Sequence, residues 1–402
     1  MIEFLNNLLE VTGFSFVGWG TVLMWAISGI LLYMGIFKQY EPLLLVPIGF
    51  GVLLANLPGA GLAVVGGDMV VNPDGSLMNL PEIASKYGIL NFLYYSLIKS
   101  GILPPVIFMG VGALTDFGPM LRNLKLAFFG GAAQIGIFTV VILAVLMGYS
   151  LPEAASMGII GGADGPTAIY TTIKLAPHML GPIAIAAYSY MAMVPVIIPA
   201  VAKLLMTKEE FGIHMKKMDK LYPPKYEIKH LRTVKIIFPI VLTLVVSVLV
   251  PSAAPLIGML MLGNLLKEIG TNTARLADAA AGPIMNTATV FLGVCVGATM
   301  PAEVFLRWET IGILVLGLFA FAISIAGGIL VVKLYNKGSK KKINPLVGAT
   351  GLSAVPMASR VANDLALKYD KSNHILQYCM SSNVSGVIGS AVAAGVLIAF
   401  LS

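Results

Sequence analysis

Long apolar stretches recur along almost the whole chain, and they restrict its fold more than any other feature. Each is roughly 17–25 residues long, the length that an α-helix needs to cross the hydrocarbon layer of a membrane. Charged residues make up only 11% of the 402 residues, whereas soluble domains carry about 25%. A soluble core of this size could not bury so much apolar surface. We therefore expect an all-α polytopic membrane protein.

Several other classes of protein are excluded by composition and pattern. A transmembrane β-barrel would alternate apolar and polar residues over segments of about 10 residues, and this pattern is absent. The net charge of +7 comes from lysines in loops 203–235 and 333–342, which indicates basic loops retained in the cytoplasm and no nucleic-acid partner. Cys295 and Cys379 form no CxxC motif, and no histidine pair has metal-site spacing. The N-terminus lacks the features of a cleaved signal peptide.

The apolar segments fall into two sets of six, on either side of a basic stretch. We expect a first membrane repeat over 1–205, a basic cytoplasmic loop over 206–233 and a second, inverted repeat over 234–402. The predicted segments are 18–37, 42–58, 96–114, 126–148, 151–175 and 178–205, then 234–250, 253–267, 283–300, 309–333, 345–367 and 373–401.

The two sets resemble each other in short motifs. Residues 47–57 (PIGFGVLLANL) are echoed by 255–265 (PLIGMLMLGNL), and 158–166 (GIIGGADGP) by 348–356 (GATGLSAVP). A looser match joins the glycine motifs that begin at Gly110 and Gly293. Three matches in the same order indicate an internal duplication.

Charge placement predicts how the halves are oriented. If the glycine-broken segments 151–175 and 345–367 do not fully cross, each half crosses five times and the halves are inverted. The basic loops 206–233 and 334–343 then share the cytoplasmic side, and loop 59–90, with Asp68, Asp74 and Glu82, lies outside. Inverted repeats with one broken helix each are a recurrent transporter design. Their ion and substrate sites lie near the membrane midplane, where we expect these breaks to meet.

Asp164 is the residue that most needs an explanation, because it lies among glycines inside an apolar segment. A charged side chain at the bilayer centre costs about 2.5–3.5 kcal/mol on insertion scales, so it is a functional candidate by default. Na⁺, like other hard cations, prefers oxygen ligands. The alternative is that Asp164 caps a half-helix at Gly165 or pairs with a structural arginine.

Other polar groups near the breaks could complete a sodium site. Asn383 is favoured, because a buried amide needs partners, whereas most serines of the last segment read as a packing face. The oxygen-bearing candidates are Thr167, Thr171, Thr172, Asn344, Thr350, Ser353, Ser359, Ser381, Ser382, Asn383, Ser385 and Ser390.

Two further residue types suggest chemistry within the membrane. Tyr188 and Tyr190 lie in the middle of an apolar segment, where a tyrosine suits hydrogen bonding or proton transfer; the alternative is an interfacial anchor. Arg360 follows the second break and has only Asp364 as a nearby acid, which suggests an anionic ligand. The alternative for Arg360 is a side chain that reaches from a helix end to the membrane surface.

Three long motifs resemble those of one known family. They are GGADGPTAIYTT from Gly161, NPLVGATGLSAVPMASRVA from Asn344 and NVSGVIGSAVAAG from Asn383. The chain resembles the β subunits of the biotin-dependent, sodium-translocating decarboxylases of oxaloacetate, methylmalonyl-CoA and glutaconyl-CoA. The resemblance covers nearly the whole chain, and motifs of this length are far more specific than a lone glycine pattern.

This resemblance implies a function for the chain. Members of the family receive carboxybiotin from a mobile carrier, release CO₂ and use the free energy to export Na⁺, consuming a proton. The expected partners are a biotin carrier with a carboxyltransferase α subunit, a small membrane-anchor γ or δ subunit, membrane lipid and further copies of the chain. The expected location is the bacterial cytoplasmic (inner) membrane. The chain has no Met-Lys-Met biotinylation motif, so its biotin must arrive on a partner.

The resemblance, together with the chemistry of the side chains, implies roles for individual residues. We expect Asp164, Asn383, Ser353 and Asn344 to bind Na⁺. The other roles follow the same motifs: Arg360, Tyr190 and Ser353 would be catalytic, and Arg360, Asn344 and Gly348 would bind the substrate. The competing hypothesis is a Na⁺- or H⁺-coupled organic-anion transporter that breaks no bond. A purely structural membrane scaffold is hard to reconcile with Asp164 and Arg360 beside helix breaks.

Overall fold

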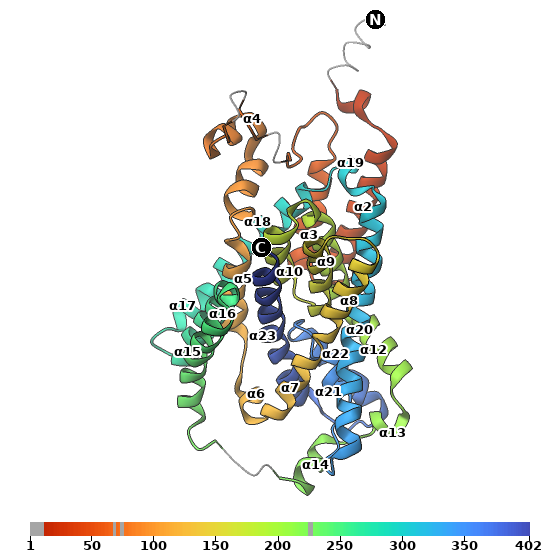
Figure 1. Ribbon diagram of the computed structural model, residues 1–402, viewed down its shortest axis with the longest axis vertical. Coiled ribbons are helices and arrows are strands. Elements are labelled where there is room, and N and C mark those ends of the chain that lie inside the picture. Colours follow the sequence, from red (N-terminus) through yellow and green to blue (C-terminus); the bar gives the residue numbers. More distant parts are fainter. Residues whose placement is uncertain (1–11, 67–69, 73–75, 224–227) are drawn as a thin grey trace, which may run out of the picture.

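The structure is a bundle of helices that surrounds a central C-terminal helix (Figure 1). This computed structural model describes residues 12–66, 70–72, 76–223 and 228–402. Asp68 and Asp74, which we predict to lie on the outer side of the membrane, are not among the described residues. Every secondary-structure element named within the described ranges is a helix.

The first half of the chain consists of helices separated by short connections. These are η1 (Gly13–Phe16), α2 (Trp19–Ile36), α3 (Pro42–Ala55), α4 (Leu80–Leu93), η3 (Tyr94–Ile98), α5 (Leu103–Leu114), α6 (Gly118–Arg122), α7 (Leu124–Ala132), α8 (Ile135–Leu146), α9 (Leu151–Gly158), η4 (Ile159–Gly162), α10 (Gly165–Leu175), η5 (Pro177–Met179), α11 (Leu180–Ala192) and α12 (Val194–Leu205).

The rest of the chain begins with two short helices in the basic stretch. The elements are α13 (Lys208–Phe211), α14 (Met215–Leu221), α15 (Leu231–Leu249), η6 (Pro251–Ala253), α16 (Ala254–Ile269), α17 (Ala274–Ala279), η7 (Ala280–Ile284), α18 (Met285–Ala298), α19 (Ala302–Phe305), α20 (Trp308–Gly338), α21 (Leu346–Ala349), α22 (Met357–Tyr369) and α23 (Leu376–Leu401).

Six helical stretches of the described chain are long and apolar enough to cross a membrane, and two bent pairs raise the number to eight. The six are Trp19–Ile36, Leu124–Leu146, Leu231–Leu249, Ala274–Ala298, Trp308–Gly338 and Leu376–Leu401. This confirms the predicted class of all-α polytopic membrane protein. The inverted relation between the halves, and the domain boundaries, remain predictions.

Two predicted segments are bent rather than continuous. Segment 96–114 bends by 67° between Ile98 and Leu103, and segment 178–205 bends by 69° between Ala192 and Val194. Prolines follow each bend, and a proline lacks the N–H that a continuous helix needs. The predicted loop 59–90 is also helical from Leu80. Asn79 and Glu82 form a capping box there, in which each side chain accepts a hydrogen bond from the other's backbone N–H.

Corresponding motifs of the predicted repeat pack in corresponding ways. Helix α3 packs against α18, and α16 packs against α5. A Cβ atom built on Gly297 would lie 2.3 Å from the carbonyl oxygen of Ile48, and one built on Gly112 would lie 1.9 Å from that of Leu260. Such close backbone approach is how membrane helices associate without a hydrophobic driving force between them.

Two buried asparagines lie at matching places in these helix pairs. Asn56 donates to the carbonyl oxygen of Met300 at 2.9 Å, just after α18. Asn264 donates to the carbonyl oxygen of Thr115 at 2.9 Å, just after α5. Each amide therefore satisfies a carbonyl that the end of a helix leaves free. The two matching sequence motifs thus place their asparagines in similar contacts.

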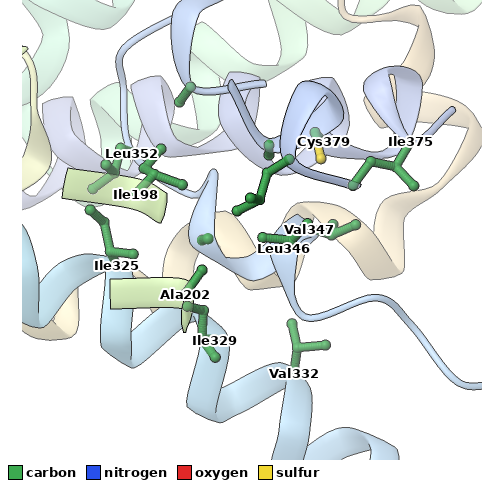
Figure 2. Packing of buried hydrophobic residues seen from close by; sticks show 14 of the residues in the cluster. Ile198, Ala202, Ile325, Ile329, Val332, Leu346, Val347, Leu352, Ile375 and Cys379 are labelled. Atoms are coloured by element: carbon green, nitrogen blue, oxygen red, sulfur yellow. The ribbon is translucent and has the colours of Figure 1, made fainter. Parts of the chain in front are cut away.

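The second helix break is held in a large apolar cluster (Figure 2). Leu346 and Val347 of α21 pack with Ile329 and Val332 of α20 and with Ala202 of α12. These side chains are all less than 2% exposed. These packed side chains surround the start of the irregular backbone that follows α21.

Candidate functional site

The first break lies where the sequence predicts it. After α9, the chain makes the single 3₁₀ turn η4, and Ala163 adopts a left-handed conformation with φ 53°. That conformation is uncommon for a residue other than glycine. Asp164 is extended and becomes the N-cap of α10. Gly165 follows, and a Cβ atom there would lie 1.9 Å from the ring of Tyr188, so a side chain does not fit.

The carboxylate of Asp164 joins three segments that are far apart in the sequence. One oxygen, Oδ1, accepts a hydrogen bond from the backbone N–H of Thr167 at 3.2 Å. The other, Oδ2, accepts from the hydroxyls of Ser353 and Ser390, each at 2.9 Å. Asp164 as a residue is 6% exposed. Asp164 is therefore a helix cap, as the alternative hypothesis predicted, and it also carries a second oxygen facing two hydroxyls.

The second break meets the first one directly. Between Ala349 and Met357 the chain is not helical, and the backbone N–H of Ser353 donates to the carbonyl oxygen of Gly162 at 2.9 Å. Asn383 of α23 donates to the carbonyl oxygen of Leu352 and accepts from the hydroxyl of Ser359. Asn383 thus holds the second break in place. No hydrogen bond joins it to Asp164 among the described residues.

Ser390 is one of the oxygen-bearing candidates, and the sequence alone favours a packing role for most serines of this segment. The structure instead places its hydroxyl on the Asp164 carboxylate. Its spacing could have indicated this, because Ser390 follows Asn383 by two helical turns and so lies on the same face of the helix. The predicted ligands Asp164 and Ser353 are brought together. The predicted ligand Asn344 is not at this carboxylate.

Asn344 lies at the base of the second break and anchors the basic stretch. Its amide donates to the carbonyl oxygens of Phe211 and Ile213, and its side-chain oxygen accepts from the N–H of Leu346. It is fully buried. Asn344 thereby fixes the basic stretch, residues 206–233, to the start of α21.

The same basic stretch is tied to helices near the second break by charged groups. Asp219 of α14 pairs with Lys341 at 2.6 Å and accepts a hydrogen bond from the hydroxyl of Tyr378 at the start of α23. A polar cavity of about 360 Å³ opens beside Asp219 and Tyr378, with Asp116 and Arg122 also in its wall. Partial burial opposes ionisation of Asp116, but hydrogen bonds from Lys235 and the Gly118 amide hold its pKa below the ordinary value.

Gly348 has a clear packing role. A Cβ atom on Gly348 would lie 2.1 Å from the carbonyl oxygen of Gly328, and one on Gly328 would lie 2.0 Å from that of Gly348. The two backbones therefore touch where α21 crosses α20, which leaves no room for a methyl group. This contact accounts for the glycine without any substrate contact.

We expect Gly348→Ala to lower the thermal stability of the protein, because forcing a methyl group into packed backbone costs about 1–3 kcal/mol. The measurement is the melting temperature of the purified protein in detergent. Gly338→Ala is the matched control, since a Cβ atom there meets no described residue within 4 Å. Equal melting temperatures for both variants would contradict the packing role.

Tyr190 and Arg360 lie in different surroundings. The Tyr190 hydroxyl donates to the carbonyl oxygen of Leu314 in α20, and its ring lies against Gly317. No hydrogen bond joins Tyr190 to Asp164 within the described part of the chain. Arg360 is exposed on α22, and its guanidinium has no ion pair or hydrogen bond with any described residue. Such a guanidinium is available to an anion.

The site is chemically suited to a monovalent hard cation. It offers one carboxylate, two hydroxyls and the backbone carbonyls of two helix breaks, and all of these ligands are oxygen atoms. No group of three His, Cys, Asp or Glu side chains that could hold a metal is found among the described residues. A single negative charge among neutral oxygens matches a cation of charge +1.

Comparison with known proteins identifies the family. The Na⁺-transporting oxaloacetate decarboxylase beta subunit family matches residues 20–401. The chain is 48% identical to the methylmalonyl-CoA decarboxylase subunit beta of Propionigenium modestum, over 99% of each chain. It is 45% identical to oxaloacetate decarboxylase beta chain 2 of Salmonella typhimurium, over 100% of this chain and 99% of that one.

A third relative is named for the decarboxylation of a different compound, glutaconyl-CoA. The chain is 46% identical to the glutaconyl-CoA decarboxylase subunit beta of Acidaminococcus fermentans, over 99% of this chain and 97% of that one. All three similarities extend over essentially the full length. The chain therefore belongs to the family of Na⁺-transporting oxaloacetate decarboxylase beta subunits and is the membrane subunit of a sodium-translocating decarboxylase.

Proposed function

We propose that this subunit releases CO₂ from carboxybiotin and uses the reaction to export Na⁺ through a site at Asp164. The observation that carries the proposal is the meeting of the two helix breaks at one buried carboxylate. Ser353 from the second break and Ser390 from α23 both donate to the same oxygen of Asp164. When Na⁺ binds, these hydroxyls would turn their oxygen lone pairs toward the ion. Asn383 and Asn344 would act from outside this contact, by fixing the second break.

Arg360 is proposed to hold the carboxylate of carboxybiotin. It is the guanidinium that lies beyond the second break without a partner among the described residues. A guanidinium binds a carboxylate through two parallel hydrogen bonds, which fixes orientation as well as charge. Asn344 and Gly348 remain proposed parts of the substrate site through the backbone that they position.

The chemical step needs a proton at the biotin ring. The bond between the carboxyl carbon and the ureido nitrogen breaks, CO₂ leaves, and the electron pair stays on nitrogen. A proton must then reach that nitrogen, from a donor such as the Tyr190 hydroxyl or from water. Ser353, in the second break, is the other residue of this chain that we propose to assist the decarboxylation. In the structure, Tyr190 donates to Leu314, so it would have to exchange that partner during the reaction.

Coupling follows from competition at a single carboxylate. Na⁺ and H⁺ both bind an ionised aspartate, so each disfavours the other at Asp164. If the proton consumed in the decarboxylation passes through Asp164, its arrival would release Na⁺. Ser353 is proposed for both the catalytic role and the Na⁺-binding role, because it belongs to the second break and donates to the Asp164 carboxylate.

The subunit is proposed to work in a complex in the bacterial cytoplasmic membrane. Carboxybiotin would arrive on a biotin carrier with its carboxyltransferase α subunit, and a small γ or δ subunit would anchor the assembly. Several copies of this chain are expected per complex. The basic stretch docked on Asn344 and Lys341 is the proposed cytoplasmic face, and the upstream acid is one of those that the relatives' names give.

The competing hypothesis is an organic-anion transporter that uses the same aspartate and arginine. The two differ in whether a bond is broken. The test supplies the purified complex with carboxybiotin labelled with ¹⁴C at the carboxyl group, free or on its carrier, and follows labelled CO₂. We expect release that depends on Na⁺. Transport of the labelled anion without CO₂ release would support the transporter and contradict this proposal.

A further inference from the structure

A glutamine that the sequence motifs do not include lies beside the two breaks. Gln134 occupies the turn between α7 and α8 and is 7% exposed. Its Nε2 donates to the carbonyl oxygens of Gly130 at 3.2 Å and Gly386 at 3.4 Å. Its Oε1 is buried and has no hydrogen-bond partner among the residues that the structure describes. A buried amide oxygen without a partner costs free energy, so its position needs an explanation.

The orientation of this amide is fixed by its neighbours. The nitrogen and oxygen of a glutamine side chain are assigned from the hydrogen bonds that they can make. Turning the Gln134 amide over would place its oxygen against the carbonyl oxygens of Gly130 and Gly386, where neither partner can donate. Nε2 therefore faces those carbonyls, and Oε1 points the other way.

The neighbouring glycines show where Oε1 lies. A Cβ atom on Gly162, in the first break, would be 3.0 Å from Cβ of Ser390 and 3.8 Å from Oε1 of Gln134. A Cβ atom on Gly389 would be 3.0 Å from Nε2 of the same glutamine. The amide therefore lies between the first break and α23, next to the serine that donates to Asp164. The absence of side chains at both glycines leaves room for it.

We propose that Oε1 of Gln134 is a ligand of the cation that Asp164 binds. This inference rests on the proposed function, in that it needs a cation at Asp164. An amide oxygen is acceptor-only and neutral, so it suits a small hard cation such as Na⁺. Binding would supply the missing partner of Oε1, while the two Nε2 hydrogen bonds hold the oxygen in place. Gln134 then extends the site from the breaks to the turn between α7 and α8.

The test uses the assembled complex and two readouts. The first is the Na⁺ concentration that gives half of the maximal thermal stabilisation, with choline chloride holding the ionic strength constant. The second is the Na⁺ concentration for half-maximal decarboxylation. Gln134→Met keeps the length and shape of the side chain but replaces the amide by a thioether, a soft group that binds Na⁺ poorly. We expect both half-saturating concentrations to rise about tenfold.

Asn264 supplies the matched control. Its amide also donates to two carbonyl oxygens, those of Gly112 and Thr115, and its Oδ1 is also buried without a partner in the described part of the chain. It belongs to α16 and contacts the end of α5 rather than Asp164. Asn264→Leu removes the same kinds of hydrogen bond, so we expect a lower melting temperature without Na⁺ and unchanged half-saturating Na⁺ concentrations.

The outcomes separate this inference from the proposed function. If Asp164→Asn raises the half-saturating Na⁺ concentrations and Gln134→Met leaves them unchanged, Gln134 is not a ligand, although the sodium site stands. If neither substitution changes them, the sodium site itself is wrong. A tenfold rise in Asn264→Leu as well would show that lost packing, rather than a lost ligand, explains the Gln134 result.

A second variant covers the case in which Gln134→Met does not fold. Gln134→Asn keeps the amide but draws its oxygen back by one methylene group, so the oxygen loses its place beside Gly162 and Ser390. We expect the half-saturating Na⁺ concentrations to rise in this variant too. A Gln134→Asn complex whose half-saturating Na⁺ concentrations equal those of the native complex would overturn the inference.

Discussion

Asp164→Asn is expected to raise the half-saturating Na⁺ concentration by roughly 100-fold, which corresponds to about 2.7 kcal/mol. The asparagine keeps the shape and one carbonyl oxygen but loses the charge. The interaction of two unit charges 4 Å apart is about 4 kcal/mol at an effective dielectric constant of 20, so losing it is enough to cause this change. The measurement is Na⁺-dependent decarboxylation by the purified complex as the Na⁺ concentration is varied.

The cap function of Asp164 makes this substitution decisive. Asn and Asp are equally good N-caps, so the hydrogen bond from the Thr167 N–H to a side-chain oxygen should survive. If capping were the whole role, Asp164→Asn would behave like the native protein in both stability and Na⁺ response. A carboxamide also cannot titrate, so any coupling to a proton should be lost together with the Na⁺ affinity.

Two companion variants sharpen the result. Asp164→Glu moves the carboxylate by one methylene group in a packed site and should retain function at weaker Na⁺ affinity. Asp370→Asn is the matched control, because Asp370 also accepts from a serine hydroxyl, that of Ser372 at 2.7 Å, but is outside the membrane segments. A normal Na⁺ response in Asp164→Asn would show that the aspartate is structural.

The second large effect is expected at Arg360. Arg360→Ala should lower kcat/KM for carboxybiotin between about 10- and 150-fold, the range for losing hydrogen bonds between charged partners. Arg360→Lys should recover only part of this, because lysine restores the charge but not the planar two-point contact. Initial rates at carboxybiotin concentrations far below KM measure kcat/KM directly.

The control for Arg360 is another exposed arginine. Arg275 lies on α17 and is also exposed, so Arg275→Ala removes a similar charge from a different part of the molecule. We expect it to leave kcat/KM unchanged. Full activity of Arg360→Ala at low substrate would rule out the substrate role, and equal losses in both variants would indicate a general effect of surface charge.

The class of fold could be predicted because membrane helices leave a strong signal in the sequence. Apolar length sets the spans, and Gly and Pro mark where a helix cannot continue, so the break before Asp164 is found at the expected residues. The bends at 98–103 and 192–194 were missed, because prolines in membrane helices are common and only the surroundings decide whether the helix turns. The helix that starts at Leu80 was missed, although its Asn79 and Glu82 capping box is visible in the sequence.

The site could be predicted only where a motif and a break coincide. Asp164 and Ser353 belong to the two matched breaks, and they do form a hydrogen bond. Ser390 looked like one of several packing serines, because nothing in a regular helix distinguishes the serine that faces a carboxylate. Nothing in the sequence marks Gln134, since its place beside Gly162 depends on how α7 packs against α23 and how α8 packs against η4. Asn344 begins one of the three long motifs, yet its side chain anchors the basic stretch and does not contact Asp164.

The coupling of the two processes is the central claim, and one measurement tests it most directly. The purified complex is reconstituted in proteoliposomes, carboxybiotin is added outside, and ²²Na⁺ uptake and ¹⁴CO₂ release are followed in the same sample. We predict that Na⁺ uptake starts with CO₂ release, keeps a fixed ratio to it, and is lost in Asp164→Asn. CO₂ release at the native rate without Na⁺ uptake, or undiminished uptake in Asp164→Asn, would contradict a decarboxylation-driven sodium site at Asp164.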